Sequence, residues 1–204
     1  MQFRFKKLTS LQIIMISAVM VFVLFLGKAG IGYAGEKSAR KDGRLEIFTL
    51  TLDDFQLSSL IKTSKGTVAT DGDPQLILNG EMYVTNIKFY MDSIYAPGDI
   101  VVYYMTDGDA GFNERHRTWA YPVPDTENWY EIEMPLTHVM ALRIDPTIYA
   151  GNRMEFGDFI FNLDASGTDY FDFSASTVFY FTVYTAIAAA ILKFIQELLT
   201  KSGE

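Results

Sequence analysis

The sequence has no cysteine and only two histidines, and both shortages narrow the chemistry that the chain can support. Without cysteine there is no disulfide framework, no thiolate zinc site and no cysteine nucleophile. Neither His116 nor His138 has a second histidine at the spacing of metal ligands. The motifs of nucleotide-binding loops and serine hydrolases are also missing. We therefore predict that the protein is not an enzyme, with no catalytic residues and no metal ligands.

Basic residues are scarce in the central part of the chain. Residues 43–173 carry 8 Lys and Arg against 21 Asp and Glu, a net charge of −13, whereas the whole chain has a net charge of −8. A region this acidic repels phosphate backbones, which argues against a nucleic-acid partner. Glu131 and Glu133 alternate along one expected strand, and a glycosidase needs two such carboxylates. We interpret them as charges on a solvated sheet face.

A long uncharged run near the N-terminus is typical of a membrane span. Residues 8–27 contain no charge, and as a helix they would extend roughly 30 Å, the thickness of a bilayer core. Basic residues precede the run, which favours residues 1–7 as a cytoplasmic N-terminus. We predict a signal anchor at 8–27 followed by a linker at 28–42. The alternative is a cleaved signal peptide, because Gly32-Tyr33-Ala34 offers small residues for a peptidase.

A second uncharged run covers residues 173–192. Aspartates precede it and lysines follow it, which predicts a transmembrane helix with a cytoplasmic tail at 193–204. The two runs agree on a two-pass protein in the cell membrane, with both termini cytoplasmic and the acidic domain extracytoplasmic. The alternative for this second run is a terminal helix that packs on the domain.

Small residues are unusually frequent in the second run. Ala186 and Ala190 lie four residues apart, on one helix face, and small residues let membrane helices approach closely. We expect this face to pack against a membrane-protein partner, a second copy of the chain, or the first helix of the same chain.

Between the two runs, residues 43–165 show the pattern of an all-β domain. Short runs of period two, such as Met140, Leu142 and Ile144, end at turn signals like Asp145-Pro146. Asn79-Gly80 is the strongest hairpin signal. No useful helical stripe interrupts these runs, so we predict a β-sandwich or jelly roll of about eight strands.

Loop carboxylates and aromatic residues are the remaining candidates for binding. Asp71 with Asp73 and Asp107 with Asp109 are separated by single glycines, and carboxylate oxygens are calcium ligands, so a structural Ca²⁺ is the one cofactor that we keep open. Sugars stack their C–H faces on aromatic rings. The candidate carbohydrate-binding residues, in or beside the later strands, are Trp119, Tyr121, Trp129 and Tyr149. The alternative is that these rings belong to the core, with Trp119 and Tyr121 the residues that we most expect to be exposed.

Several short motifs occur in a recognisable order. They are IVVYYMT at 100–106, FNER at 112–115, WYEI at 129–132, ALRIDP at 141–146 and MEFGDFIF at 154–161. Together, over residues 98–163, they resemble the extracytoplasmic jelly-roll module of bacterial membrane glycosyltransferases and surface-polysaccharide proteins. The large transferase part of such proteins has no counterpart in this sequence, so no catalytic residue carries over. The resemblance implies carbohydrate-related recognition outside the cell.

Two functions of different classes follow. The first is a membrane-anchored, non-catalytic carbohydrate-binding or accessory module in bacterial cell-surface polysaccharide synthesis or export, with a glycan as its partner. The second is a structural subunit of a larger membrane assembly, in which the sandwich binds another protein.

Overall fold

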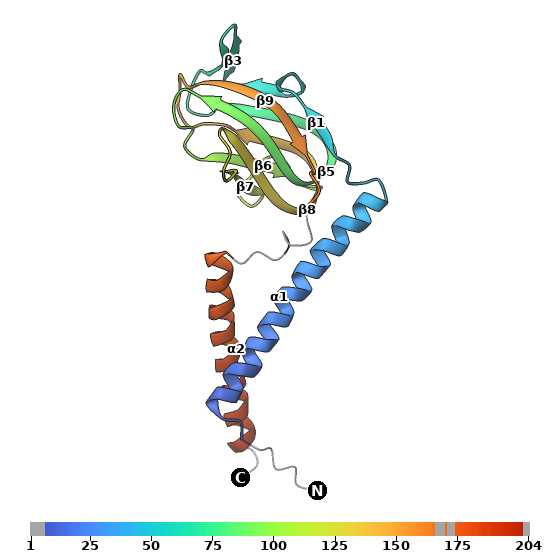
Figure 1. The fold of residues 1–204 in the computed structure, drawn as a ribbon, viewed down its shortest axis with the longest axis vertical. Helices are drawn as coiled ribbons and strands as arrows, with labels where there is room; N and C mark the ends of the chain where they lie inside the picture. The colour runs from blue at the N-terminus through green and yellow to red at the C-terminus, as the bar shows by residue number, and fades with distance from the viewer. Residues whose placement is uncertain (1–6, 166–169, 171–173, 202–204) are drawn as a thin grey trace. The chain divides into compact units, whose positions relative to one another are not determined.

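A computed structural model describes residues 7–165, 170 and 174–201 of the chain (Figure 1). It divides into two compact units, one formed by residues 1–34 with 165–204 and the other by residues 35–164. We call the first the helical unit and the second the β unit, and each is described by itself.

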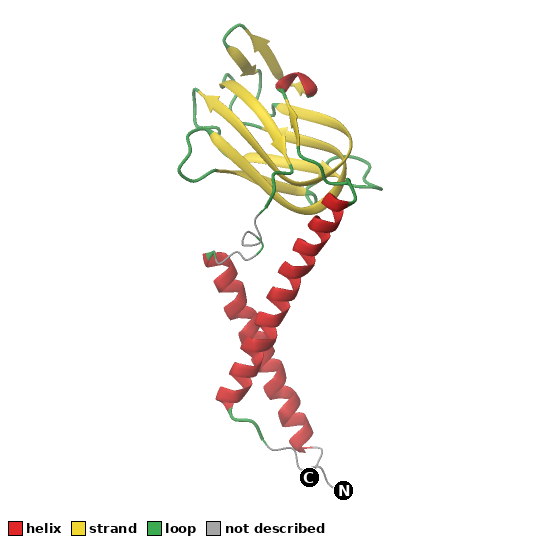
Figure 2. Cartoon of the chain, turned by 45° about the vertical axis from the view of Figure 1, so that its right-hand side comes forward, coloured by secondary structure: helices red, strands yellow, loops and turns green. Residues whose placement is uncertain are grey.

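The described residues contain two long helices, α1 (Ser10–Lys41) and α2 (Ala175–Lys201), coloured red in Figure 2. Both are long and apolar enough to cross a membrane, by length and composition. Little of either apolar window is buried in the protein, and large apolar side chains such as Leu24, Phe179 and Phe194 are exposed. A helix that is apolar on its exposed faces suits a lipid environment.

Within the helical unit, α1 and α2 meet through a few side chains. The Phe25 ring lies 6.2 Å from that of Phe181 and 6.3 Å from that of Tyr184, centroid to centroid. On α2, Ala186 and Ala190 are exposed, so other residues make the contact with α1. The packing role of these two alanines therefore stays a prediction that concerns a partner.

Residues 28–41, expected to form a linker, continue α1 without a break. The segment contains three glycines, but eight of its 14 residues are alanine, lysine, arginine or glutamate, which are good helix formers. Arg40 also binds Glu36 four residues earlier, through two nitrogen–oxygen contacts of 3.0 and 2.7 Å. Such an i,i+4 pair stabilises the last turns of a helix.

In the described residues, nine strands form one antiparallel sheet, which confirms the expected mainly β, sandwich-like fold. The strands are β1 (Phe48–Leu50), β2 (Gln56–Ser58), β3 (Leu60–Thr63), β4 (Gly66–Ala69), β5 (Gln75–Ser93), β6 (Ile100–Met105), β7 (Arg117–Pro122), β8 (Trp129–Asp145) and β9 (Arg153–Phe161). Their order is β3-β4-β9-β5-β8-β6-β7, with β1 added on β9 and β2 on β5. A short 3-10 helix, Leu52–Asp54, follows β1.

The long strands β5 and β8 pair over most of their length and bend together. Their register shifts between Asn79 and Met82 and again between Val84 and Asn86. The hairpin predicted at Asn79-Gly80 was therefore wrong, because the chain continues as one strand through an irregularity. Gly80 supplies the required backbone angle, φ +141°, and irregularities of this kind bend a strand pair. The predicted end of β8 at Asp145-Pro146 is confirmed.

Alternating side chains build the core inside the curled sheet. Phe89 of β5 and Phe159 of β9 are fully buried and stack with ring centroids 5.2 Å apart. Phe161 stacks in the same way on Phe48 of β1, at 4.6 Å. Ile132, Leu142 and Ile144 of β8 are also fully buried, as their period of two predicts.

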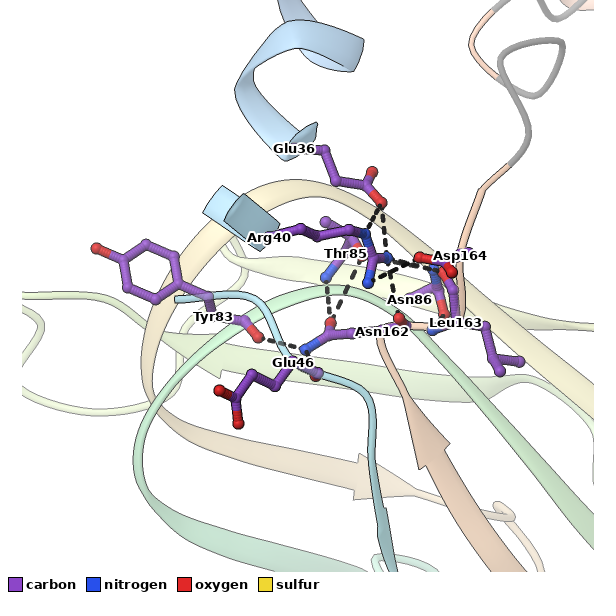
Figure 3. A network of polar contacts seen from close by, with 9 residues as sticks. All are labelled: Glu36, Arg40, Glu46, Tyr83, Thr85, Asn86, Asn162, Leu163 and Asp164. Atoms are coloured by element: carbon purple, nitrogen blue, oxygen red, sulfur yellow. Dashed lines mark hydrogen bonds and ion pairs between the residues drawn. The ribbon is translucent and has the colours of Figure 1, made fainter. Parts of the chain in front are cut away.

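The chain enters and leaves the β unit at the same end, which we call the base (Figure 3). The Arg40 guanidinium donates hydrogen bonds to the carbonyls of Asn162 and Leu163, at 2.9 and 3.1 Å. It also pairs with Asp164 at 3.1 Å. Since Arg40 belongs to the last turn of α1 and residues 162–164 follow β9, this side chain ties the entering segment to the leaving segment.

Asn162 organises the base from the inside. It is 1% exposed and has a left-handed backbone, φ +60°. Its amide nitrogen donates to the carbonyls of Glu46 and Tyr83, at 3.0 and 2.8 Å. Its amide oxygen accepts the backbone N–H of Thr85 at 3.0 Å. The Asn86 side chain binds both the N–H and the carbonyl of Leu163, at 2.9 Å each. The second register shift of β5 thus supplies two consecutive residues, Thr85 and Asn86, to this cluster.

Candidate functional site

The site with the clearest binding character is a surface pocket of about 400 Å³ on the β unit. The loop between β5 and β6, the start of β6 and the end of β7 form its walls. Its lining residues are Gly98, Asp99, Ile100, Trp119, Ala120, Tyr121 and Pro122. We call it the aromatic pocket.

Strand alternation places the two aromatic rings of β7 on the outer face. Ala120 is directed inward, where it is 9% exposed and pairs with Ile100 of β6. Its neighbours Trp119 and Tyr121 therefore share the opposite face, and they are 37% and 64% exposed. The expectation that these two rings are exposed agrees with the structure.

A row of polar and aromatic side chains supports Trp119 from the neighbouring strands. The Arg117 guanidinium lies 5.0 Å from the centre of the Trp119 ring and forms an ion pair with Glu114. Glu114 also accepts a hydrogen bond from the hydroxyl of Tyr103, at 3.3 Å. Tyr103 in turn lies under the guanidinium of Arg143, 5.1 Å away. Arg117, Tyr103 and Arg143 are direct cross-strand neighbours on β7, β6 and β8, so one face of Trp119 is covered by a fixed cation.

Gly98 and Asp99 form the other wall. Gly98 has a left-handed backbone, φ +76°, and a Cβ there would lie 3.1 Å from Ile148 and 3.6 Å from the ring of Tyr149. Glycine is needed here because two loops approach closely. Tyr149, which is 48% exposed, thus lies behind the wall of the pocket and does not line it. Asp99 is exposed and forms no hydrogen bond or ion pair with the described residues.

Trp129 lies on the same sheet face but outside the pocket. It begins β8, packs edge-on against Tyr90 with ring centroids 5.9 Å apart, and is covered by the Lys88 ammonium at 5.6 Å. The link to the pocket is Glu131, two residues further on, which is the direct cross-strand partner of Tyr121. The structure thus brings together Trp119 and Tyr121 in the pocket lining, places Tyr149 next to Gly98 outside the lining, and leaves Trp129 half-buried.

The loop carboxylates considered for calcium bind protein groups. Asp109 accepts hydrogen bonds from the N–H and hydroxyl of Thr106, at 2.7 and 2.9 Å, and contacts His116 Nδ1 at 2.8 Å. These donors lower the pKa of Asp109 from 3.8 to about 2, the Thr106 N–H contributing most. Asp71 binds the Asp73 N–H and the Ser59 hydroxyl, and both bonds lower its pKa.

Arg143, near the end of β8, links this region to that strand. It forms a bidentate pair with Asp145, at 2.6 and 2.7 Å, and a third contact with Asp73 at 2.6 Å. Burial raises the pKa of Asp145, while the two bonds from Arg143 favour its charged form. Within the part of the chain that the structure describes, no three His, Asp or Glu side chains are placed to hold a metal ion. A structural Ca²⁺ stays a prediction.

Sequence reasoning missed Gly98, Asp99 and Arg117. The turn Ala96-Pro97-Gly98 is visible in the sequence, but nothing in it indicates that β7 lies beside it. Arg117 could have been found from its spacing of two from Trp119, which puts both on one face of a strand.

No protein-family model and no curated protein matches the chain. Among solved structures, a low-affinity xylan-binding module, CBM86, from the gut symbiont Roseburia intestinalis matches 60% of this chain and 98% of its own length. Its sequence identity is 12% and the TM-score 0.39. The lectin-binding domain of lectinolysin, solved with Lewis b, matches 54% of this chain and 92% of its own, with 9% identity and a TM-score of 0.39.

A chitosan-binding module from a chitosanase/glucanase of Paenibacillus sp. IK-5 matches 57% of this chain and 94% of its own, with 14% identity and a TM-score of 0.34. With TM-scores below 0.40, these similarities do not decide what this chain binds. The case for its function depends on its own residues.

Proposed function

We propose that the β unit binds a glycan, without catalysis, at the aromatic pocket. The observation that carries the proposal is the pairing of two exposed rings, Trp119 and Tyr121, on one strand face beside the exposed carboxylate of Asp99. Aromatic rings attract the C–H faces of sugars, and a carboxylate accepts hydrogen bonds from their hydroxyls.

The spacing of the rings favours an oligosaccharide over a single sugar. Residues two apart on a strand lie roughly 7 Å from each other, which is wider than one pyranose ring. Trp119 and Tyr121 are thus placed to stack on successive sugars of a chain. A hydrolase would need a second carboxylate facing Asp99, and Asp99 is the one carboxylate in the pocket lining.

The wider setting of the proposal is the cell surface. We place α1 and α2 across the cell membrane, with α1 as an uncleaved signal anchor. Both termini are then cytoplasmic, and the β unit is extracytoplasmic. The protein then serves as an accessory module in bacterial surface-polysaccharide synthesis or export. Support comes from the length and apolar character of both helices and from the resemblance of residues 98–163 to modules of polysaccharide proteins.

The test is a glycan array probed with the full-length protein in a polyoxyethylene detergent, because sugar-headed detergents would compete for the pocket. Binding should be confirmed by calorimetry. Trp119→Ala and Tyr121→Ala should each weaken binding about fivefold or more, since a stacked aromatic contributes about 1–3 kcal/mol. The control is Tyr180→Ala, a tyrosine of α2 that lies outside the pocket lining and is 52% exposed. Equal losses in all three variants, or no bound glycan, would overturn the proposal.

A protein partner is the second candidate, and exposed apolar groups favour it. Ile94, Tyr95 and Ile148 are 53%, 58% and 52% exposed on two adjoining loops, which are joined by the bond from the Ile148 N–H to the Pro97 carbonyl. Exposed apolar patches often mark interfaces. A pull-down from membranes in mild detergent should recover a stoichiometric membrane protein if the chain is a structural subunit. Substituting Ala186 and Ala190 by leucine should then release it.

A further inference from the structure

The charges around the aromatic pocket carry an inference about the class of sugar, which rests on the proposed glycan-binding function. We propose that the pocket takes uncharged or amino-bearing sugars and rejects acidic ones, and that Asp99 sets this choice.

The lining of the pocket offers a bound sugar one formal charge, and it is negative. Of the lining residues, only Asp99 carries a carboxylate, and the lining contains no lysine, arginine or histidine. Asp99 is exposed and has no cationic partner among the described residues. Just outside the lining, Glu131 lies directly across from Tyr121. A carboxylate or sulfate on the ligand would therefore approach like charge, whereas a hydroxyl or ammonium could donate to Asp99.

Three cations on the strands around the pocket already have anionic or aromatic partners. Arg117 stacks on Trp119 and pairs with Glu114. Arg143 is held by Asp145 and Asp73. Lys88 lies over the Trp129 ring, opposite Glu131 on the neighbouring strand. Recruiting any of them for an acidic sugar would cost an existing interaction, so they do not convert the pocket into an anion site.

The wider charge of the domain acts in the same direction. The β unit, residues 35–164, carries 11 Lys and Arg against 21 Asp and Glu, a net charge of −10. This charge repels polyanions before contact and does so less at high ionic strength. A polysaccharide rich in uronic acid or sulfate is thus disfavoured by both the local carboxylate and the field of the domain.

The experiment compares one ligand with its own charged derivative. The full-length protein, in the same polyoxyethylene detergent, is titrated by calorimetry with its best uncharged ligand from the array. It is then titrated with that ligand after its primary alcohols have been oxidised to carboxylates. At low salt the wild type should bind the oxidised form more weakly by up to about fivefold, since one exposed charge contact is worth up to about 1 kcal/mol. The difference should shrink at 0.5 M NaCl.

Two variants complete the test. Asp99→Asn should narrow the difference between the two ligands to about twofold. Asp107→Asn, which removes an exposed carboxylate from the turn after β6, should leave the difference unchanged. Equal or tighter binding of the oxidised ligand by the wild type would overturn the inference while the glycan-binding proposal stands. The same holds if Asp99→Asn and Asp107→Asn behave alike. If no sugar of any class binds, both proposals fail.

Discussion

Asn162 offers the sharpest test of how the base of the β unit is stabilised. Replacing it by alanine removes its hydrogen bonds to the Glu46 carbonyl, the Tyr83 carbonyl and the Thr85 N–H, in a place where the side chain is 1% exposed. Each buried bond is worth about 1 kcal/mol. A left-handed backbone at alanine costs about 1 kcal/mol more. Asn162→Ala should therefore lower the free energy of unfolding by roughly 3–4 kcal/mol.

Asn128 is the matched control for this substitution. It has nearly the same backbone angle, φ +62°, but its side chain forms one exposed hydrogen bond, to Asp92 at 3.2 Å. Asn128→Ala should thus cost only about 1 kcal/mol, mostly from the backbone. Asn162→Gly separates the two terms, because glycine relieves the backbone strain and leaves only the loss of the hydrogen bonds.

The assay is urea denaturation of the full-length protein in mild detergent, followed by tryptophan fluorescence. Both tryptophans of the chain, Trp119 and Trp129, lie in the β unit, so the signal reports this unit and not the helices. Equal shifts of the unfolding midpoint for Asn162→Ala and Asn128→Ala would refute the reasoning that the buried bonds of Asn162 stabilise the base.

Three further predictions use the same assay. Arg40→Met removes the cation from the buried carboxylate of Glu36 and from two carbonyls, and it should cost roughly 3 kcal/mol, with a smaller loss in a Glu36→Gln background. Gly66→Ala should be about 2 kcal/mol more destabilising than Gly80→Ala. A Cβ at Gly66 would lie 2.7 Å from the Met154 carbonyl oxygen, whereas a Cβ at Gly80 would meet no atom within 4 Å. Similar urea midpoints of unfolding for the two variants would contradict this prediction. Asp109 has a folded-state pKa of about 2 against an ordinary 3.8, so its stabilising contribution is present above pH 3.8 and is lost as the pH falls toward 2. Asp109→Asn should flatten the dependence of stability on pH across that window, and a slope equal to that of the wild type would count against the assignment.

The strand pattern of the β unit was largely visible in the sequence because apolar residues recur with a period of two in several strands. Met140, Leu142 and Ile144 revealed β8, and Pro146 marked its end. The course of β5 was not visible, since Asn79-Gly80 has the composition of a hairpin turn and only the pairing with β8 shows that the strand continues. Local propensity cannot distinguish a turn from an irregularity that a partner strand stabilises.

The candidate site was visible only in part. Trp119 and Tyr121 could be proposed as exposed from their place beside a proline-containing loop, whereas Trp129 resembles them in sequence but lies under Lys88. Asp99 has no local feature that sets it apart from the other aspartates. It belongs to the pocket only because β6 pairs with β7 and so brings two segments 20 residues apart into one wall. Pairing at that distance is a property of the fold, not of a motif.

The tie between Arg40 and residues 162–164 has a consequence for how this domain can be inherited and engineered. A domain whose two ends lie next to each other can be inserted into a loop of another protein without forcing that loop apart. In the β unit, hydrogen bonds of Asn162, Asn86 and Arg40 hold the two ends of the domain together. The β unit should therefore keep its fold when residues 35–164 are inserted as one segment between two helices of an unrelated membrane protein.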